Sequence, residues 1–223
     1  FSGIKSGTAT TVYARAVDKV GNVSGSISNK GTTTSITGTV TITQSPTAWT
    51  NGNVTVTLSY ANIPTGYVMQ YKIGSGNWTA YSSALTVSEN NTKITARLYN
   101  SSVNDEVSVS SKTIANIDKV APDITDMKVT LTATENTITA VASGATDSLS
   151  GEIKYKYSLN NSTWQDSGTF SNIKSGTSVT IYARAIDKAG NASGSKSSNS
   201  ISTSNIGAVT ITPSTTAWIS GNV

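Results

Sequence analysis

The sequence contains no cysteine and no histidine. Without cysteine the chain has no disulfide scaffold and no thiol nucleophile. Without histidine it lacks the side chain that most often acts as a base near neutral pH. Only 13% of the 223 residues are charged, and no apolar run reaches the ~18 residues that suggest a membrane-spanning helix. These absences argue against an enzyme and against membrane insertion by this stretch of chain.

The net charge of the chain is also small. The 16 Lys and Arg exceed the 12 Asp and Glu by only four, and the basic residues are scattered rather than gathered in a stripe. A nucleic-acid partner is therefore not expected. Glutamate occurs only four times, and no window carries the apolar spacing of an amphipathic helix. Thr, Val, Ile and Tyr instead fill alternating runs, which favours an all-β fold.

The sequence repeats itself at a distance of 169 residues. Without a gap, Phe1 matches Phe170, Trp49 matches Trp218 and Val54 matches Val223, and 34 of the 54 overlapped residues are identical. A fixed period of this kind is typical of repeat architectures. We expect the chain to be a window from a longer repetitive polypeptide, containing one period and part of the next.

Each period contains two related units, A and B. Both have six or seven short strand-like runs separated by turn residues, which predicts antiparallel β-sandwiches arranged end to end. We expect a complete A-type sandwich at residues 39–119 and a complete B-type sandwich at 120–206. Residues 1–38 would be the last strands of a B-type unit, and 207–223 the first strands of an A-type unit. Their open edges would pair with neighbouring repeats or with another molecule.

Alternation along the strands predicts which faces are buried. The expected strands of unit A are 40–43, 54–60, 68–73, 84–87, 93–99 and 107–114. The expected strands of unit B are 128–134, 137–143, 153–159, 178–186 and a polar last strand near 195–203. Val54, Val56, Leu58 and Tyr60 share one face in unit A, and Val179, Ile181, Ala183 and Ala185 share one face in unit B.

Four aromatic or basic side chains are candidates for a surface role. Tyr182 and Arg184 alternate with the apolar face and should point to solvent, either as a cross-strand pair or as a ligand-binding surface. Trp78 and Trp164 follow equivalent turns in the two units. We expect both indoles to cover the cores, with a carbohydrate platform as the alternative.

A repeated pentapeptide predicts a hairpin turn rather than a chemical site. It reads DKVGN at 18–22 and DKAGN at 187–191. A type I turn favours Asp first and Gly fourth, and the Asp carboxylate can accept backbone N–H groups. The structural residues of these turns are Asp18, Gly21, Asn22, Asp187, Gly190 and Asn191. Unit A has Val103 where the turn has glycine, so its hairpin should use a different turn.

The acidic residues gather in turns and around the connection at Pro122. Paired carboxylates can hydrolyse glycosides, but these positions suit turn-capping better, and no catalytic residue is expected. No cofactor is expected either. The alternative to having no bound ion is calcium held by oxygen ligands, and the candidates are Asp118, Asp123, Asp126, Asp147 and Glu152. Without calcium, these acids are ordinary solvated side chains.

Three segments carry a family resemblance: VTITQSPTAWTNGNVTVT (40–57), NIDKVAPDI (116–124) and YARAIDKAGN (182–191). They resemble the tandem immunoglobulin-like and fibronectin type III-like repeats of Gram-positive bacterial surface proteins. Similar modules occur in phage fibres and as accessory domains of extracellular glycosidases. Some such sandwiches carry a Lys–Asn isopeptide crosslink, for which Lys128 and Asn191 are the conceivable partners here.

The resemblance implies a non-enzymatic stalk or spacer in an extracellular surface or fibre protein. The alternative is an adhesive module that binds carbohydrate or protein. The implied partners are neighbouring repeats of the same chain or filament and, for the alternative, a surface glycan or protein ligand. The implied location is extracellular: the cell surface, the secreted fraction or a virion fibre.

Overall fold

The computed structural model describes residues 1–204 except positions 2 and 30. It divides into two compact units, Phe1–Val120 and Ala121–Val223. This described part consists of strands and turns, and it contains no helix long and apolar enough to cross a membrane. The all-β, antiparallel prediction is confirmed. The predicted partial sandwich at 207–223 lies outside the described residues.

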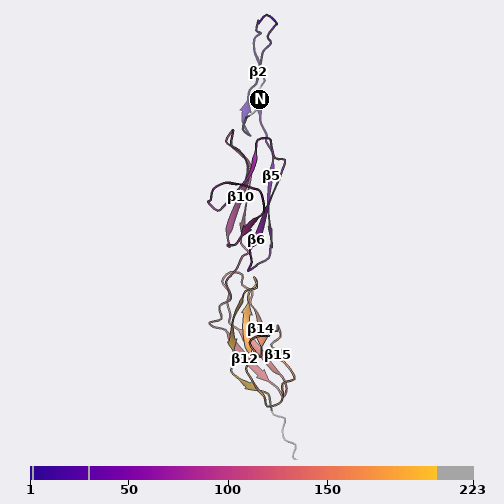
Figure 1. Cartoon of the computed structure of the whole chain (residues 1–223), viewed down its shortest axis with the longest axis vertical. Helices are drawn as coiled ribbons and strands as arrows, with labels where there is room; N and C mark the ends of the chain where they lie inside the picture. The colour runs from indigo at the N-terminus through magenta and orange to yellow at the C-terminus, as the bar shows by residue number, and fades with distance from the viewer. Residues whose placement is uncertain (2, 30, 205–223) are drawn as a thin grey trace, which may run out of the picture. The chain divides into compact units, whose positions relative to one another are not determined.

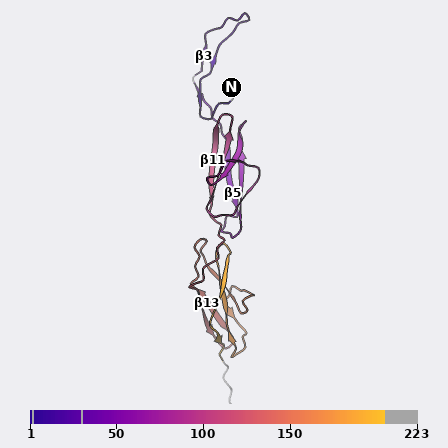
Figure 2. The same cartoon turned by 60° about the vertical axis from the view of Figure 1, so that its left-hand side comes forward.

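The first unit contains a sandwich of two antiparallel sheets (Figures 1 and 2). One sheet has the order β5-β6-β9, with β5 at Thr39–Ser45, β6 at Val54–Ala61 and β9 at Leu85–Val87. The other has the order β11-β10-β7-β8, with β7 at Val68–Ile73, β8 at Thr79–Ala80, β10 at Thr92–Asn100 and β11 at Asp105–Ile114.

The core of this sandwich follows from the two-residue period of its strands. Ile94, Ala96 and Leu98 alternate along β10 and are fully buried, and Val54 and Val56 of β6 are equally buried. The residues between them point to the outer faces. A β-branched and aliphatic core of this kind supplies most of the stabilisation of a small sandwich.

The second unit has the same two-layer construction from shorter strands. Its sheets have the orders β12-β13-β15, β14-β17-β18 and β16-β19. The strands are β12 at Lys128–Ala133, β13 at Ile138–Ser143, β14 at Lys154–Ser158, β15 at Thr169–Phe170, β16 at Ser178–Val179, β17 at Tyr182–Ile186, β18 at Ala192–Ser197 and β19 at Ile201–Ser202.

One predicted strand is interrupted in the structure. The run 178–186 forms β16 and β17 with a break between them, because the backbone N–H of Ile181 donates to the Ser198 hydroxyl, at 3.0 Å, instead of to a strand carbonyl. The core continues through the break, since Ile181 is fully buried with Ala183 and Ala185. Alternation therefore predicts the buried face even where the ladder of backbone hydrogen bonds stops.

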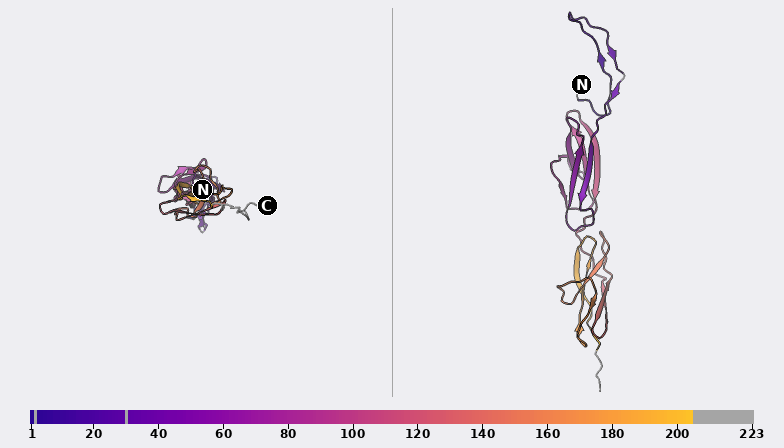
Figure 3. Two further views of the ribbon diagram at one scale, coloured as in Figure 1. Left: turned by 90° about the horizontal axis from the view of Figure 1, so that it is seen from below. Right: turned by 90° about the vertical axis from the view of Figure 1, so that its right-hand side faces the viewer.

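Residues 3–34, apart from position 30, form a narrow antiparallel ribbon, which belongs to the first unit. Its strands are β1 at Ala9–Thr10, β2 at Tyr13–Ala14, β3 at Ile27–Ser28 and β4 at Thr32–Thr33. Figure 3 shows the ribbon as a single pair of chain segments with no second layer over it. The assignment of these residues to half of a B-type sandwich stays a prediction.

Candidate functional site

The repeated pentapeptide forms the hairpin turn between β17 and β18. Asp187 Oδ1 accepts the backbone N–H of Asn191 at 2.8 Å, and Oδ2 accepts its side-chain amide at 2.7 Å. The N–H of Gly190 donates to the Asp187 carbonyl at 3.2 Å. Gly190 has φ +94°, a conformation that a Cβ would strain. The aspartate thus holds the turn together.

The earlier copy of the pentapeptide has the same geometry in the ribbon. Asp18 Oδ1 accepts the N–H groups of Asn22 at 2.8 Å and of Val20 at 3.0 Å. Gly21 also has φ +94°. Hydrogen bonds from the side chain and backbone of Asn22 hold the pKa of Asp18 below its ordinary value. A carboxylate engaged in this way has a structural role in its own turn.

The β10–β11 hairpin of the first unit uses another turn. Asn104 takes the left-handed conformation, with φ +47°, and its Oδ1 accepts the Tyr99 hydroxyl at 2.9 Å. Asparagine tolerates this conformation better than β-branched residues do. The neighbouring Val103 does not occupy the left-handed position.

The outer face of the first unit carries a stacked arginine. The guanidinium carbon of Arg97 lies 3.9 Å from the Trp78 ring centroid and 4.1 Å from the Tyr99 ring centroid. Its Nε and Nη2 donate to Gln70 Oε1 at 3.0 and 2.9 Å, and Nη1 pairs with Glu106 at 2.6 Å. Each end of the guanidinium therefore has a partner, and the rings cover its faces.

The second unit has a counterpart with fewer partners. Arg184 lies 4.5 Å from the Trp164 ring centroid, and its buried Nε has no hydrogen-bond partner among the described residues. Beside it, Lys156 forms an ion pair with Asp166 at 2.8 Å, and the hydrogen bond from Lys156 lowers the pKa of Asp166. Tyr182, the other predicted surface residue, is half-buried.

The prediction that the two tryptophans cover the cores differs from the structure. Trp78 and Trp164 stack on Arg97 and Arg184, which alternate with buried apolar residues and so face outward. An arginine on the outer face offers an indole both apolar contact and a favourable cation–π geometry. Neither indole belongs to the buried clusters of the two units.

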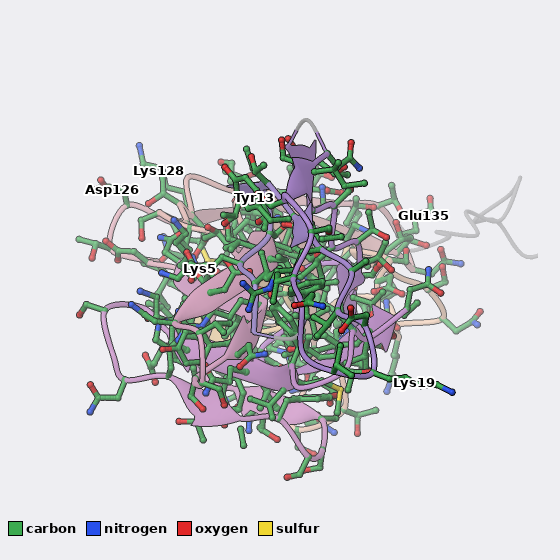
Figure 4. The ribbon with its side chains drawn as sticks, turned by 90° about the horizontal axis from the view of Figure 1, so that it is seen from above. Lys5, Tyr13, Lys19, Asp126, Lys128 and Glu135 are labelled. Atoms are coloured by element: carbon green, nitrogen blue, oxygen red, sulfur yellow. The ribbon has the colours of Figure 1, made fainter. Side chains whose placement is uncertain are left out.

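Most of the predicted calcium candidates have partners of their own. Asp123 Oδ1 accepts the N–H and hydroxyl of Thr125, and the side-chain hydrogen bond lowers the pKa of Asp123. Glu152 pairs with Lys188 at 3.3 Å. Asp126 is exposed and points outward in Figure 4. Asp118 is buried in the first unit and accepts the N–H of Val120 at 2.9 Å.

Two aspartates of the second unit come close together. Carboxylate oxygens of Asp147 and Asp187 lie within 4.8 Å of each other. Asp147 Oδ2 also accepts the N–H groups of Gly151 at 2.7 Å and of Leu149 at 3.0 Å. The sequence predicts a turn-holding role for Asp187. It does not predict the contact with Asp147, because sequence spacing does not show that the loop of Asp147 folds back beside Asp187. Of these two acids only Asp147 is a calcium candidate from the sequence, where calcium is the alternative to no bound metal. That alternative is untested, and the absence of a cofactor stays a prediction.

The adjacent acids Asp105 and Glu106 have different partners. Asp105 Oδ2 accepts the Tyr67 hydroxyl and the backbone N–H of Ser6, whereas Glu106 pairs with Arg97. The hydrogen bond from Tyr67 lowers the pKa of Asp105. Burial, followed by this hydrogen bond, raises the pKa of Tyr67 to about 12. The two carboxylates point to different partners because neighbouring strand residues face opposite sides of a sheet.

No protein-family model and no curated protein sequence matches the chain. Among solved structures it is similar to titin domains A168–A170, with 14% identity, a TM-score of 0.47, and coverage of 88% of this chain and 75% of that one. It is also similar to the chicken CNTN1 FN1–FN3 domains, with 16% identity, a TM-score of 0.37, and coverage of 86% and 76%.

A third similar structure is that of the fibronectin(III)-like modules of Clostridium thermocellum CbhA. Here the identity is 17%, the TM-score 0.35, and the coverage 74% of this chain and 94% of that one. The fold is immunoglobulin-like and fibronectin III-like, with antiparallel sheets packed around a core in each unit. The Gram-positive relationship that the sequence suggests stays a prediction.

Proposed function

We propose that the chain is a non-enzymatic structural spacer, built from repeated sandwiches in an extracellular surface or fibre protein. The observation that carries this proposal is the path of the chain through each sandwich. A domain that receives the chain at one end and releases it at the other adds its own length to a tandem array. A domain whose two ends lie together adds much less.

The first sandwich receives and releases the chain at opposite ends of β6. At one end, Thr39 at the start of β5 pairs with Ala61 at the end of β6. At the other, Asn116 follows the last strand and donates its amide to the carbonyls of Pro46 and Ala48, at 3.1 and 2.6 Å. Eight residues of extended strand, about 26 Å, separate the two ends.

The second sandwich has the same polarity. The chain enters at Lys128, the start of β12, which pairs with Ser143 at the end of β13. It leaves beyond β19, where the N–H of Ser204 donates to the carbonyl of Thr134 at 3.0 Å, just past the opposite end of β12. Each unit therefore carries the chain along the length of its strands, which is the property that a spacer requires.

Solution scattering of chains with one, two and three 169-residue periods tests the spacer. We expect the maximum dimension to grow linearly by roughly 70–90 Å per period, since each unit contributes the length of its strands and loops. Growth with the cube root of mass, as for a compact globule, contradicts the proposal. Neighbouring repeats of the same chain or filament are the proposed partners.

Binding on the outer face of the second unit is a second candidate function. It is favoured by the buried Arg184 Nε, which lies beside a half-buried Trp164 and has no hydrogen-bond partner within the described part of the chain. A glycan array tests it: saturable binding should disappear in Tyr182→Ala and persist in Tyr13→Ala. Tyr13, 169 positions before Tyr182, is the equivalent tyrosine, and it lies in the ribbon. An array with no saturable signal rejects this candidate.

A further inference from the structure

We propose that the apolar face of the ribbon is a docking face for the first half of a B-type sandwich, a segment with the sequence of residues 120–169. The ribbon is residues 3–34, and its apolar face is formed by Val12, Ala14, Ala16 and Ile27. The proposal concerns what covers this face and does not depend on the spacer function.

The ribbon reproduces the second half of the second unit pair by pair. When two residues of the ribbon pair with each other, the two residues 169 positions later also pair with each other. The matching pairs are Ala9–Thr33 with Ser178–Ser202, Thr10–Thr32 with Val179–Ile201, Tyr13–Ser28 with Tyr182–Ser197, Ala14–Ile27 with Ala183–Lys196, and Val17–Val23 with Ile186–Ala192. Both end in the same Asp–Gly turn.

Burial of the equivalent residues differs between the two. In the second unit Ile181, Ala183 and Ala185 are completely buried. In the ribbon the equivalent Val12 is 37% exposed, and Ala14 and Ala16 are exposed. Identical register with opposite burial means that the ribbon has the shape of a sandwich half and lacks the layer that covers it.

The second unit shows what that layer is. The strand β14 pairs with β17 along Lys154–Ser158, and this places a third strand on the edge that β2 leaves open in the described part of the ribbon. Ile138 and Met127 pack in the same buried cluster as Ile181 and Ala183. The strand β14 and the core residues Met127 and Ile138 all belong to residues 120–169.

The face has room for such side chains. A groove of ≈ 350 Å³ runs along it, lined by Ala14, Arg15, Ala16, Ser24, Gly25 and Ile27. One contact of the second unit has no equivalent here: Lys196 donates to the carbonyls of Ile124 and Thr125, whereas the ribbon has Ile27 at that position. Ile27 is 75% exposed, so this difference enlarges the apolar area to be covered.

A second copy of the chain is a poor occupant. Its own residues 120–169 already cover Ile181 and Ala183, and docking on the ribbon would expose them. A further segment of this sequence has no such cost.

The test is a chain with a second copy of residues 120–169 joined directly before Phe1. Hydrogen exchange of the amides at 12–16 and 23–28 is compared with that of the original chain. We expect exchange to slow about 100-fold or more, because these amides would become part of a cooperative core. Ile138→Asp in the added copy is the matched control and should remove the protection.

The added copy and the ribbon must also lose their protection from hydrogen exchange together. Val12→Asp in the ribbon should abolish protection in both the ribbon and the added segment, while residues 39–204 remain unchanged. Unaltered exchange at 12–16 in the extended chain overturns the proposal, whether or not the added segment folds. So does a dimer of the original chain in light scattering with these amides protected, because the face then belongs to a second copy.

Discussion

Arg97 and Arg184 occupy the same place on β10 and β17, but their surroundings differ. Both face outward between buried apolar residues, Ala96 and Leu98 for Arg97 and two alanines for Arg184, and both stack on a tryptophan. Arg97 also contacts Gln70, Glu106 and a second ring, whereas the buried Nε of Arg184 has no hydrogen-bond partner in residues 1–204 as described. The alternation that fixes the core is common to both units, and the outer face varies around it.

The two cores differ in side-chain size but use the same device to satisfy a backbone amide. The first unit is filled by Val54, Val56 and Leu58 on its inner strand, and the Tyr81 hydroxyl accepts the N–H of Leu58 at 3.1 Å. In the second unit the inner strand carries smaller alanines, and the Tyr157 hydroxyl accepts the N–H of Ala142 at 3.1 Å. Tyrosine therefore fills space and pairs a buried donor at once.

Truncating the cores should produce the largest effects. Ile94→Ala and Ile181→Ala should each cost about 2–5 kcal/mol of unfolding free energy, because both side chains are completely buried. Hydrogen exchange resolved by segment should show the loss in the unit that carries the change. Exposed Val109→Ala and Val141→Ala are the matched controls. Equal destabilisation of both units by either core variant would contradict two separate cores.

The hairpins give the next effect. Gly190→Val should cost about 1–3 kcal/mol, because it forces a β-branched residue to a positive φ. Gly194→Ala is the control, since the added Cβ meets nothing closer than 4.0 Å and no positive φ is involved. In the first unit Asn104→Gly should cost less than Gly190→Val, because glycine adopts this conformation readily and only an exposed hydrogen bond from the Tyr99 hydroxyl is lost. Thermal melting measures all three, and an unchanged Gly190→Val melt refutes the turn.

Substitution by lysine should lower the unfolding free energy more at Arg97 than at Arg184. Arg97→Lys should cost about 1–2 kcal/mol, because lysine cannot make the forked contacts to Gln70 and Glu106 while stacking between two rings. Arg184→Lys should cost less than about 0.5 kcal/mol, since only one ring contact is at stake. Denaturant unfolding checks the order, and a larger loss at Arg184 would reverse the comparison.

Alternation predicts the strands well and the outer contacts poorly. Val68–Ile73 has the predicted bounds, and the predicted burial of Val54, Val56, Ile181 and Ala183 agrees with the structure. Two-residue strands such as β8 and β15 carry too few residues to show a period. The stacking of Trp78 on Arg97 and the approach of Asp147 to Asp187 depend on how loops fold back. No local pattern encodes that.

The smallest expected effect is a pH dependence at Asp105. Its pKa is lowered in the folded state, so its contribution is present above the unfolded value of about 3.9 and is lost as pH falls through the lower folded value. Tyr67 has the opposite sign: with a folded pKa of about 12, its contribution is full below about 10 and disappears as pH rises to about 12. Asp105→Asn should lower the melting temperature by about 1–2 °C at neutral pH.

The comparison with the second unit sharpens this prediction. Asp166 is also held below its ordinary pKa, but its side chain is exposed and its partner is a surface lysine. Because water screens such a pair, Asp166→Asn should change the melting temperature less than Asp105→Asn does. The gap between Asp105→Asn and the unchanged chain should close in strong acid, where both carry a neutral group. A gap that persists there means that the side chain acts through packing rather than through its charge.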